Sequence, residues 1–147
     1  MTFDILLVED NPGDVRLTNE AFREINPAVR VWPASDGAEA MDFLRRERDH
    51  KHAPRPDLIL LDLNMPGMLG LQALKEIRAN KQFSQIPIIV LTTSTLHQDR
   101  KASYELGASC YLRKPDSFAE LVEITDSIVK LWLHQLEPQL QPPTQKS

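Results

Sequence analysis

Asp62 has the position in this chain that most clearly predicts chemistry. It follows the apolar run Leu58–Leu61, so its carboxylate stands at the tip of a strand that the run predicts to be buried. A charge is costly there. Three other apolar runs also end in polar residues, which are Glu9 with Asp10, Thr92, and Lys114. Such side chains suit one site that binds a divalent cation and a phosphoryl group.

The elements that must position these residues alternate along the chain, with five apolar runs each followed by an amphipathic segment. This pattern predicts a parallel sheet flanked by helices. The predicted strands are 4–8, 29–34, 58–61, 88–91 and 110–112, and the predicted helices are 13–25, 38–46, 69–79, 98–106 and 117–136. We predict an α/β doubly wound sheet of flavodoxin-like order 2-1-3-4-5, with helices on both faces. That order places the acidic residues at the central switch point, beyond the carboxyl ends of the strands.

Length and composition limit the possible classes of protein. The 147 residues suit one domain, predicted over 1–137, followed by a flexible tail over 138–147 that is rich in proline and glutamine. A formal charge of −4 argues against nucleic-acid binding by a basic face. There is no apolar stretch of about 18 residues and no signal-peptide pattern, so we expect no membrane span and a cytoplasmic location.

The polar residues, taken in order, resemble the receiver domain of two-component response regulators over nearly the whole chain. The matching motifs are Glu9-Asp10, the segment 62–67, Thr92, Tyr111 and Lys114-Pro115. The opening segment 9–14 and the long loop before Asp62 further resemble the small stand-alone receivers that partner bacterial phytochrome histidine kinases. The resemblance implies a single-domain response regulator whose partner is a histidine kinase, with a phytochrome as the candidate.

The resemblance also implies roles for the residues at the strand ends. Asp62 is expected to attack a phosphohistidine of the kinase and to form an acyl phosphate. Each close pair of carboxylates in this group costs about 3 to 4 kcal/mol at an effective dielectric constant of about 20, and Mg²⁺ relieves the repulsion. The expected Mg²⁺ ligands are Asp10 and Asp62 directly, the Asn64 main-chain carbonyl, and Glu9 through water. The expected phosphate contacts are Lys114 and Thr92.

Two further expectations concern the signal that follows phosphorylation. Thr92 is drawn toward the phosphate, and Tyr111 moves inward into the space that this opens. The Lys114–Pro115 bond is expected to be cis, so that the lysine turns back toward Asp62. We expect no effector domain, so the output is a contact with another protein or the draining of phosphate from the kinase. The chain is expected to catalyse only its own phosphotransfer and dephosphorylation.

The last predicted helix carries an apolar arc of about 200°, wider than the arc of about 100° that packing on one sheet face requires. We therefore predict a homodimer through the fourth helix, fifth strand and fifth helix. The predicted interface residues are Ile124, Ile128, Leu131 and Trp132. The alternative is that the extra arc packs under the tail 138–147.

Two alternative functions and one departure from the family pattern also follow from the sequence. A receiver-like binding module that is never phosphorylated is disfavoured by the intact set of site residues. A phosphoaspartyl phosphatase of the haloacid-dehalogenase type carries a second aspartate two residues after the nucleophile, where this chain has Asn64. Thr93 stands where most receivers have a smaller residue, and its bulk is expected to slow access to the phosphate. Asn64 and Ser94 occupy positions that tune hydrolysis in the family.

Overall fold

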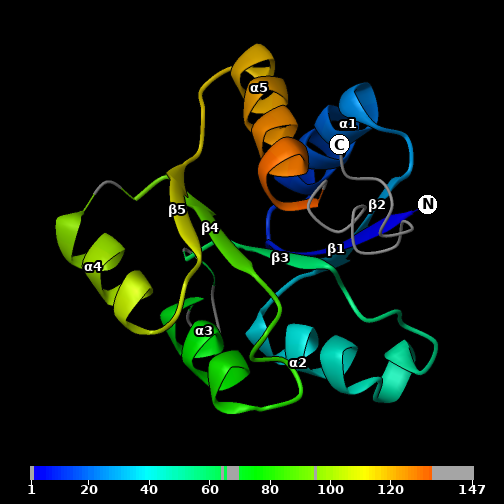
Figure 1. The fold of residues 1–147 in the computed structure, drawn as a ribbon, viewed down its shortest axis with the longest axis vertical. Helices are drawn as coiled ribbons and strands as arrows, with labels where there is room; N and C mark the ends of the chain where they lie inside the picture. Colours follow the sequence, from blue (N-terminus) through cyan, green and yellow to red (C-terminus); the bar gives the residue numbers. More distant parts are fainter. Residues whose placement is uncertain (1, 64, 66–69, 95, 134–147) are drawn as a thin grey trace, which may run out of the picture.

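The computed structural model describes residues 2–63, 65, 70–94 and 96–133. Its centre is a five-stranded parallel sheet of order β2-β1-β3-β4-β5 (Figure 1), as the sequence predicts. The strands are β1 (Phe3–Val8), β2 (Val29–Ala34), β3 (Leu58–Leu61), β4 (Ile88–Thr92) and β5 (Cys110–Arg113). The predicted α/β fold class and strand order are therefore confirmed.

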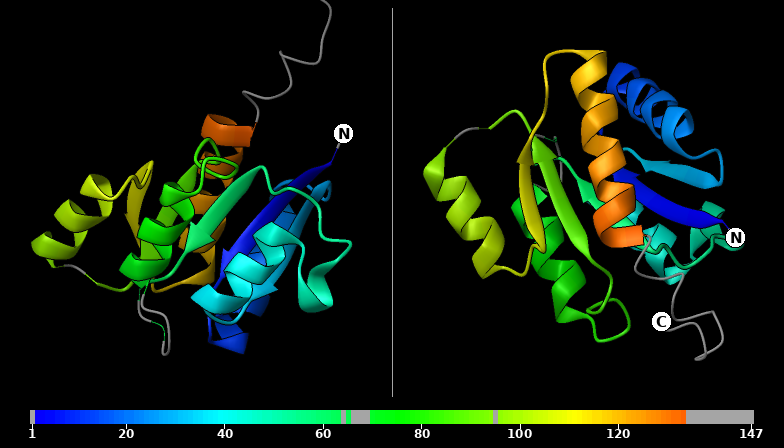
Figure 2. Two further views of the ribbon diagram at one scale, coloured as in Figure 1. Left: turned by 90° about the horizontal axis from the view of Figure 1, so that it is seen from below. Right: turned by 45° about the horizontal axis from the view of Figure 1, so that its top comes forward.

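Five helices cover the two faces of this sheet. One face carries α1 (Pro12–Ile25) and α5 (Phe118–Ile128), which pack side by side (Figures 1 and 2). The other carries α2 (Gly37–Arg45), α3 (Gly70–Ala79) and α4 (His97–Glu105). A 3₁₀ turn, η1 (Arg48–His50), lies in the segment predicted as a loop. No helix in the described part of the chain is long and apolar enough to cross a membrane.

The three central strands are buried along their whole length, and their side chains alternate between two cores. Leu6, Val8 and Ile59 belong to the core beneath α2 and α3. Ile5 and Leu7 belong to the core beneath α1 and α5. Because both faces of these strands are covered, near-continuous apolar runs are required, and that requirement explains their signal in the sequence. The same requirement locates the ends of the strands, because polar residues begin where the apolar runs end.

The end of the last helix differs from the prediction. The α-helical ladder stops at Ile128, and a π-helical turn, η2 (Val129–Leu133), continues it. The rest of the predicted helix and the predicted tail lie outside the described residues.

The wide apolar arc of α5 is largely used inside the molecule, because this helix packs against both the sheet and α1. Ile128 is 1% exposed and lies in the core, so its prediction as an interface residue is wrong. Ile124 and Trp132 are partly buried against the same core. Leu131 is 60% exposed, and it is the one predicted interface residue that is open to solvent.

A second polar group surrounds the buried Asp4 near the start of β1, far from the carboxyl edge of the sheet. Asp4 faces Arg30 in the β1–β2 register and accepts two hydrogen bonds from its guanidinium, at 2.8 and 3.1 Å. Trp32 Nε1 donates a third, at 2.9 Å. Asp57 is tied to the same place, because its Oδ2 accepts from the Asp4 backbone N–H at 2.8 Å. Burial raises the pKa of Asp57.

Candidate functional site

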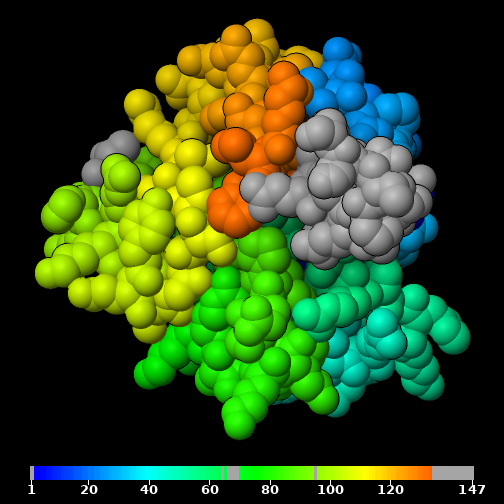
Figure 3. Space-filling view, in the orientation of Figure 1, coloured from blue at the N-terminus to red at the C-terminus, as the bar shows by residue number. Residues whose placement is uncertain are grey.

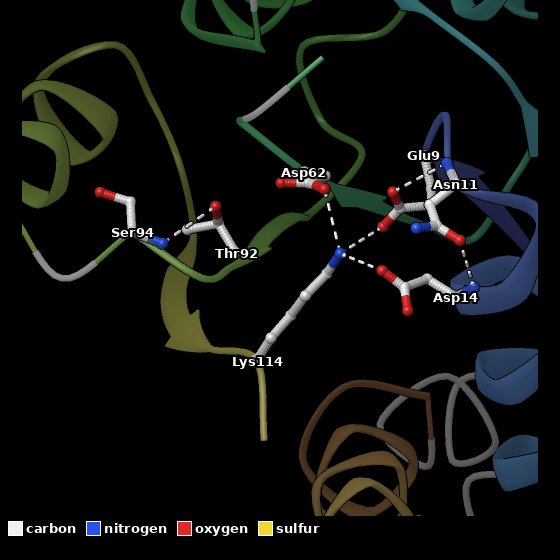
Figure 4. A network of polar contacts seen from close by, with 7 residues as sticks. All are labelled: Glu9, Asn11, Asp14, Asp62, Thr92, Ser94 and Lys114. Carbon is white, nitrogen blue, oxygen red and sulfur yellow. Dashed lines mark hydrogen bonds and ion pairs between the residues drawn. The ribbon is translucent and has the colours of Figure 1, made fainter. Parts of the chain in front are cut away.

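The carboxyl edge of the sheet brings together the polar residues that the sequence places at strand ends. Glu9 and Asp10 follow β1, Asp62 follows β3, Thr92 ends β4 and Lys114 follows β5. These strands are neighbours and parallel, so their ends converge from segments up to about a hundred residues apart (Figure 4). Glu9, Asp10 and Asp62 each offer a carboxylate oxygen, and these oxygens lie within 4.8 Å of one another.

Lys114 links the acidic side chains to one another. Its Nζ donates to Glu9 Oε1 at 2.6 Å and to Asp62 Oδ2 at 3.0 Å. It also donates to Asp14 Oδ2 at 3.0 Å. Figure 4 shows the lysine reaching from the end of β5 toward all three carboxylates. The ammonium has three protons, so each of these contacts uses one of them.

The backbone at Lys114 corrects one prediction. Every peptide bond among the described residues is trans, so the expected cis Lys114–Pro115 bond is wrong for this structure. The Lys114 N–H donates to the Thr92 carbonyl at 2.8 Å, which carries the β4–β5 pairing one residue further. With the backbone held in this way, the side chain reaches Asp62 without a cis bond.

Burial sets the electrostatics of this site. Glu9 and Asp62 are only 4% and 5% exposed, whereas Asp10 faces solvent. Desolvation raises the pKa of Glu9 from 4.5 to about 7; the hydrogen bond from Lys114 opposes this rise, and the negative charge of Asp62 adds to it. Burial alone lowers the pKa of Lys114, but the hydrogen bonds to Glu9, Asp14 and Asp62 outweigh it and raise that pKa. The site therefore holds more negative charge than one lysine neutralises.

This donor set suits a hard divalent cation. Carboxylate oxygens are the ligands that Mg²⁺ and related ions prefer, and three of them converge here from two strand ends. The predicted fourth contributor, Asn64, lies outside the described residues.

Asp14 was not among the predicted site residues. It lies in the first turn of α1, where Asn11 Oδ1 caps the helix by accepting from the Asp14 N–H at 3.1 Å. Helix α1 begins directly after β1, so its first turn must lie at the carboxyl edge of the sheet. An acidic residue in that turn is the signal that could have identified it.

The predicted switch residues are connected through Ser94. Thr92 is fully buried, and its Oγ1 accepts from the Ser94 N–H at 3.4 Å. The Tyr111 hydroxyl donates to the Ser94 carbonyl at 2.9 Å, and the Ser94 hydroxyl donates to Asp99 Oδ2 at 2.6 Å. Asp99 lies in the first turn of α4. Hydrogen bonds to Ser94 thus connect the end of β4, the Tyr111 side chain on β5 and the start of α4.

Two residues next to the site differ in how much room surrounds them. Thr93 is exposed beside the buried Thr92. Gly70, the first residue of α3, lies so close to the backbone after β3 that a Cβ there would stand 2.4 Å from Leu63 Cα and 2.8 Å from the Asp62 carbonyl oxygen. Only glycine fits that contact.

Comparison with known proteins agrees with this geometry. Residues 5–126 match the family model of the response regulator receiver domain. The response regulator Rcp1 of Synechocystis sp. is 41% identical over 129 residues, which are 88% of each chain.

Solved structures give the same result. The phosphorylated cyanobacterial phytochrome response regulator RcpA superposes with a TM-score of 0.86 at 40% identity, over 92% of this chain and 96% of that one. The Mn²⁺-bound form of Rcp1 gives 0.81 at 40% identity, over 89% and 94%. The response regulator RPA3017 in red light signalling of R. palustris gives 0.82 at 28% identity, over 89% and 94%. The chain belongs to the family of response regulator receiver domains.

Proposed function

We propose that this protein accepts a phosphoryl group on Asp62 from a phosphohistidine of a histidine kinase. An Asp62 carboxylate oxygen attacks phosphorus, the P–N bond breaks, and the imidazole leaves with the electron pair. The observation that carries the proposal is the position of Asp62, which is almost fully buried, 3.0 Å from Lys114 Nζ and grouped with Glu9 and Asp10. The oxygens of a transferring phosphoryl group need positive charge beside them, which Lys114 supplies and a bound cation would increase.

The cation of this site is proposed to be Mg²⁺. Asp10 and Asp62 would bind it directly, the Asn64 carbonyl would be a further ligand, and Glu9 would bind through water. When bound, the ion neutralises charge on the transferring phosphoryl group. Support comes from the converging carboxylates and from the relative Rcp1, which has been solved in a Mn²⁺-bound form.

A phytochrome is the proposed kinase partner. The support is that two similar structures, RcpA and RPA3017, are described as a phytochrome response regulator and as a regulator in red light signalling. A kinase of this kind would meet the protein in the cytoplasm, which is the location we propose.

The proposed switch follows the contacts around Ser94. A phosphoryl group on Asp62 would take the Thr92 hydroxyl, which now accepts from the Ser94 N–H. Ser94 is also the acceptor for Tyr111 and the donor to Asp99, so its movement reaches β5 and α4 together. In Figure 3, α4, β5 and α5 form one continuous stretch of surface, which we propose as the output surface.

A homodimer through this surface is also proposed, with Leu131 as its exposed apolar contact and Ile124 and Trp132 at its inner edge. Analytical ultracentrifugation at micromolar concentration, with and without beryllofluoride, tests it. Leu131→Asp should give a folded monomer, whereas Leu17→Asp, at another exposed leucine on α1, should leave the dimer intact. A wild-type chain that sediments as a monomer in both states would remove the dimer.

Phosphorylation itself is tested by labelling with acetyl phosphate and Mg²⁺, and then with a phosphorylated phytochrome kinase. Wild-type protein should be labelled, and Asp62→Asn should take up no label. Asp116→Asn removes a nearby exposed carboxylate and should label as wild type does. Equal labelling of wild type and Asp62→Asn would refute Asp62 as the acceptor. No labelling of wild type by either donor would favour the non-phosphorylated binding module.

A further inference from the structure

Asp14 accepts one of the three hydrogen bonds of the Lys114 ammonium, although it lies outside the group of carboxylates that suits a cation. Lys114 Nζ lies 3.0 Å from Asp14 Oδ2, the same distance as from Asp62 Oδ2. The cation group consists of Glu9, Asp10 and Asp62. A bound cation would compete with the lysine for Glu9 and Asp62, but it would leave the Asp14 contact in place.

The direction of the Asp14 side chain toward Lys114 has a local cause. In a capping box, a Glu or Gln at the third position of a helix reaches back to the backbone N–H of the capping residue. In α1 that residue is Asn11, and its N–H already donates to Glu9 Oε2 at 3.2 Å. The carboxylate of Asp14 is therefore released from capping, and it lies on the side of the helix that faces Lys114 (Figure 4).

The geometry points to Asp14 as a positioning residue that holds Lys114 Nζ over Asp62 during phosphoryl transfer, an inference that rests on the proposed function. A lysine side chain has a flexible four-carbon stem, so its ammonium must be fixed if it is to meet one oxygen of the donor. During transfer the Asp62 oxygen attacks phosphorus and the P–O bond of a donor such as acetyl phosphate breaks, with acetate leaving. The contact of Lys114 with Asp62 then passes to a phosphoryl oxygen, and Asp14 remains as its anchor.

A carboxylate also repels an anionic donor, so its removal has two opposing effects that an experiment must separate. Asp116 provides the matched control. It is exposed, borders the same hollow of about 200 Å³ as Asp14 and Lys114, and bonds to no described residue. Asp116→Asn therefore removes a neighbouring charge without removing a contact to Lys114.

The test measures the rate of phosphorylation of the full chain over a range of acetyl phosphate concentrations in Mg²⁺. Asp14→Asn should lower the saturating rate by about tenfold, as loss of alignment of a catalytic group does. It should leave the half-saturating concentration unchanged or lower. Asp14→Glu should restore most of the rate, and Asp116→Asn should keep the wild-type saturating rate. Thermal melting of each variant establishes that it is folded.

A second measurement does not depend on turnover. An ammonium held by carboxylates exchanges its protons slowly, so the Lys114 Nζ signal should be visible by NMR in wild type with Mg²⁺ and beryllofluoride, and should broaden in Asp14→Asn. Equal saturating rates for Asp14→Asn and Asp116→Asn, with an unchanged Nζ signal, would overturn the role of Asp14. A wild-type chain that takes no phosphate would instead overturn the proposed function, and the Nζ signal alone would then decide the Asp14 contact.

Discussion

Strand β1 has a buried carboxylate near each of its ends, and the two are neutralised in opposite ways. Asp4, near the start, accepts from both Arg30 and Trp32, so its charge is matched and its hydrogen bonds are filled. Glu9, just beyond the end, lies in a group where one lysine faces three carboxylates. The paired charge of Asp4 suits a structural role, whereas the carboxylates around Glu9 form a donor set that suits a divalent cation.

Addition of Mg²⁺ should give the largest difference in stability between a variant of the cation group and a variant at Asp4. At about 100 times its Kd, an ion that binds only the folded state adds roughly 2.7 kcal/mol to the free energy of unfolding. Urea denaturation with and without Mg²⁺ measures this increment. Asp10→Asn should lose most of it, and Asp4→Ala should keep it. An increment that Asp4→Ala abolishes would mean that the two regions are not independent.

Asp4→Ala should have the next largest effect, and it should appear with or without metal. The variant leaves the Trp32 indole N–H without its acceptor and breaks the paired contact with Arg30. Because the Arg30 side chain is half exposed, we expect a loss of about 2 kcal/mol in the free energy of unfolding. Glu20→Ala, which removes an exposed partner of Arg16, should change it by less than about 0.5 kcal/mol. Equal losses in the two variants would contradict the structural role of Asp4.

Asp10→Asn in metal-free protein should have the opposite sign. It removes one of three neighbouring negative charges from the cation group, so the free energy of unfolding should rise by about 1 kcal/mol. Chemical denaturation in EDTA measures the change. A destabilised variant would show that Asp10 makes a favourable contact that outweighs the repulsion.

The last effect concerns pH. The pKa of Glu9 is raised from 4.5 to about 7, so the folded state binds this proton more tightly than the unfolded chain does. The resulting stability is fully present below pH 4.5 in metal-free protein and is lost as the pH rises through about 7. Mg²⁺ needs the ionised group, so its affinity should rise over the same window. Mg²⁺ titrations from pH 5.5 to 8 should show this rise in wild type and a flatter profile in Glu9→Gln.

The sequence predicts this fold well because the central strands are buried on both faces and are therefore apolar throughout. It also predicts the grouping of the site residues, because parallel strands end at the same edge of the sheet. Contacts that depend on side-chain direction were not predictable in the same way. The pairing of Asp4 with Arg30 requires the β1–β2 register, which no local pattern contains. The contact of Asp14 with Lys114 joins residues a hundred positions apart, and no local pattern predicts it. Helical periodicity gives the apolar arc of α5 but cannot tell that Ile128 faces the core.

Gly70 has a consequence for how the chain can vary. Its missing Cβ lets the first turn of α3 rest on the backbone that follows Asp62, and every other amino acid would place an atom inside that contact. In a library of random variants, Gly70 should therefore tolerate as little replacement as Asp62, although it carries no reactive group.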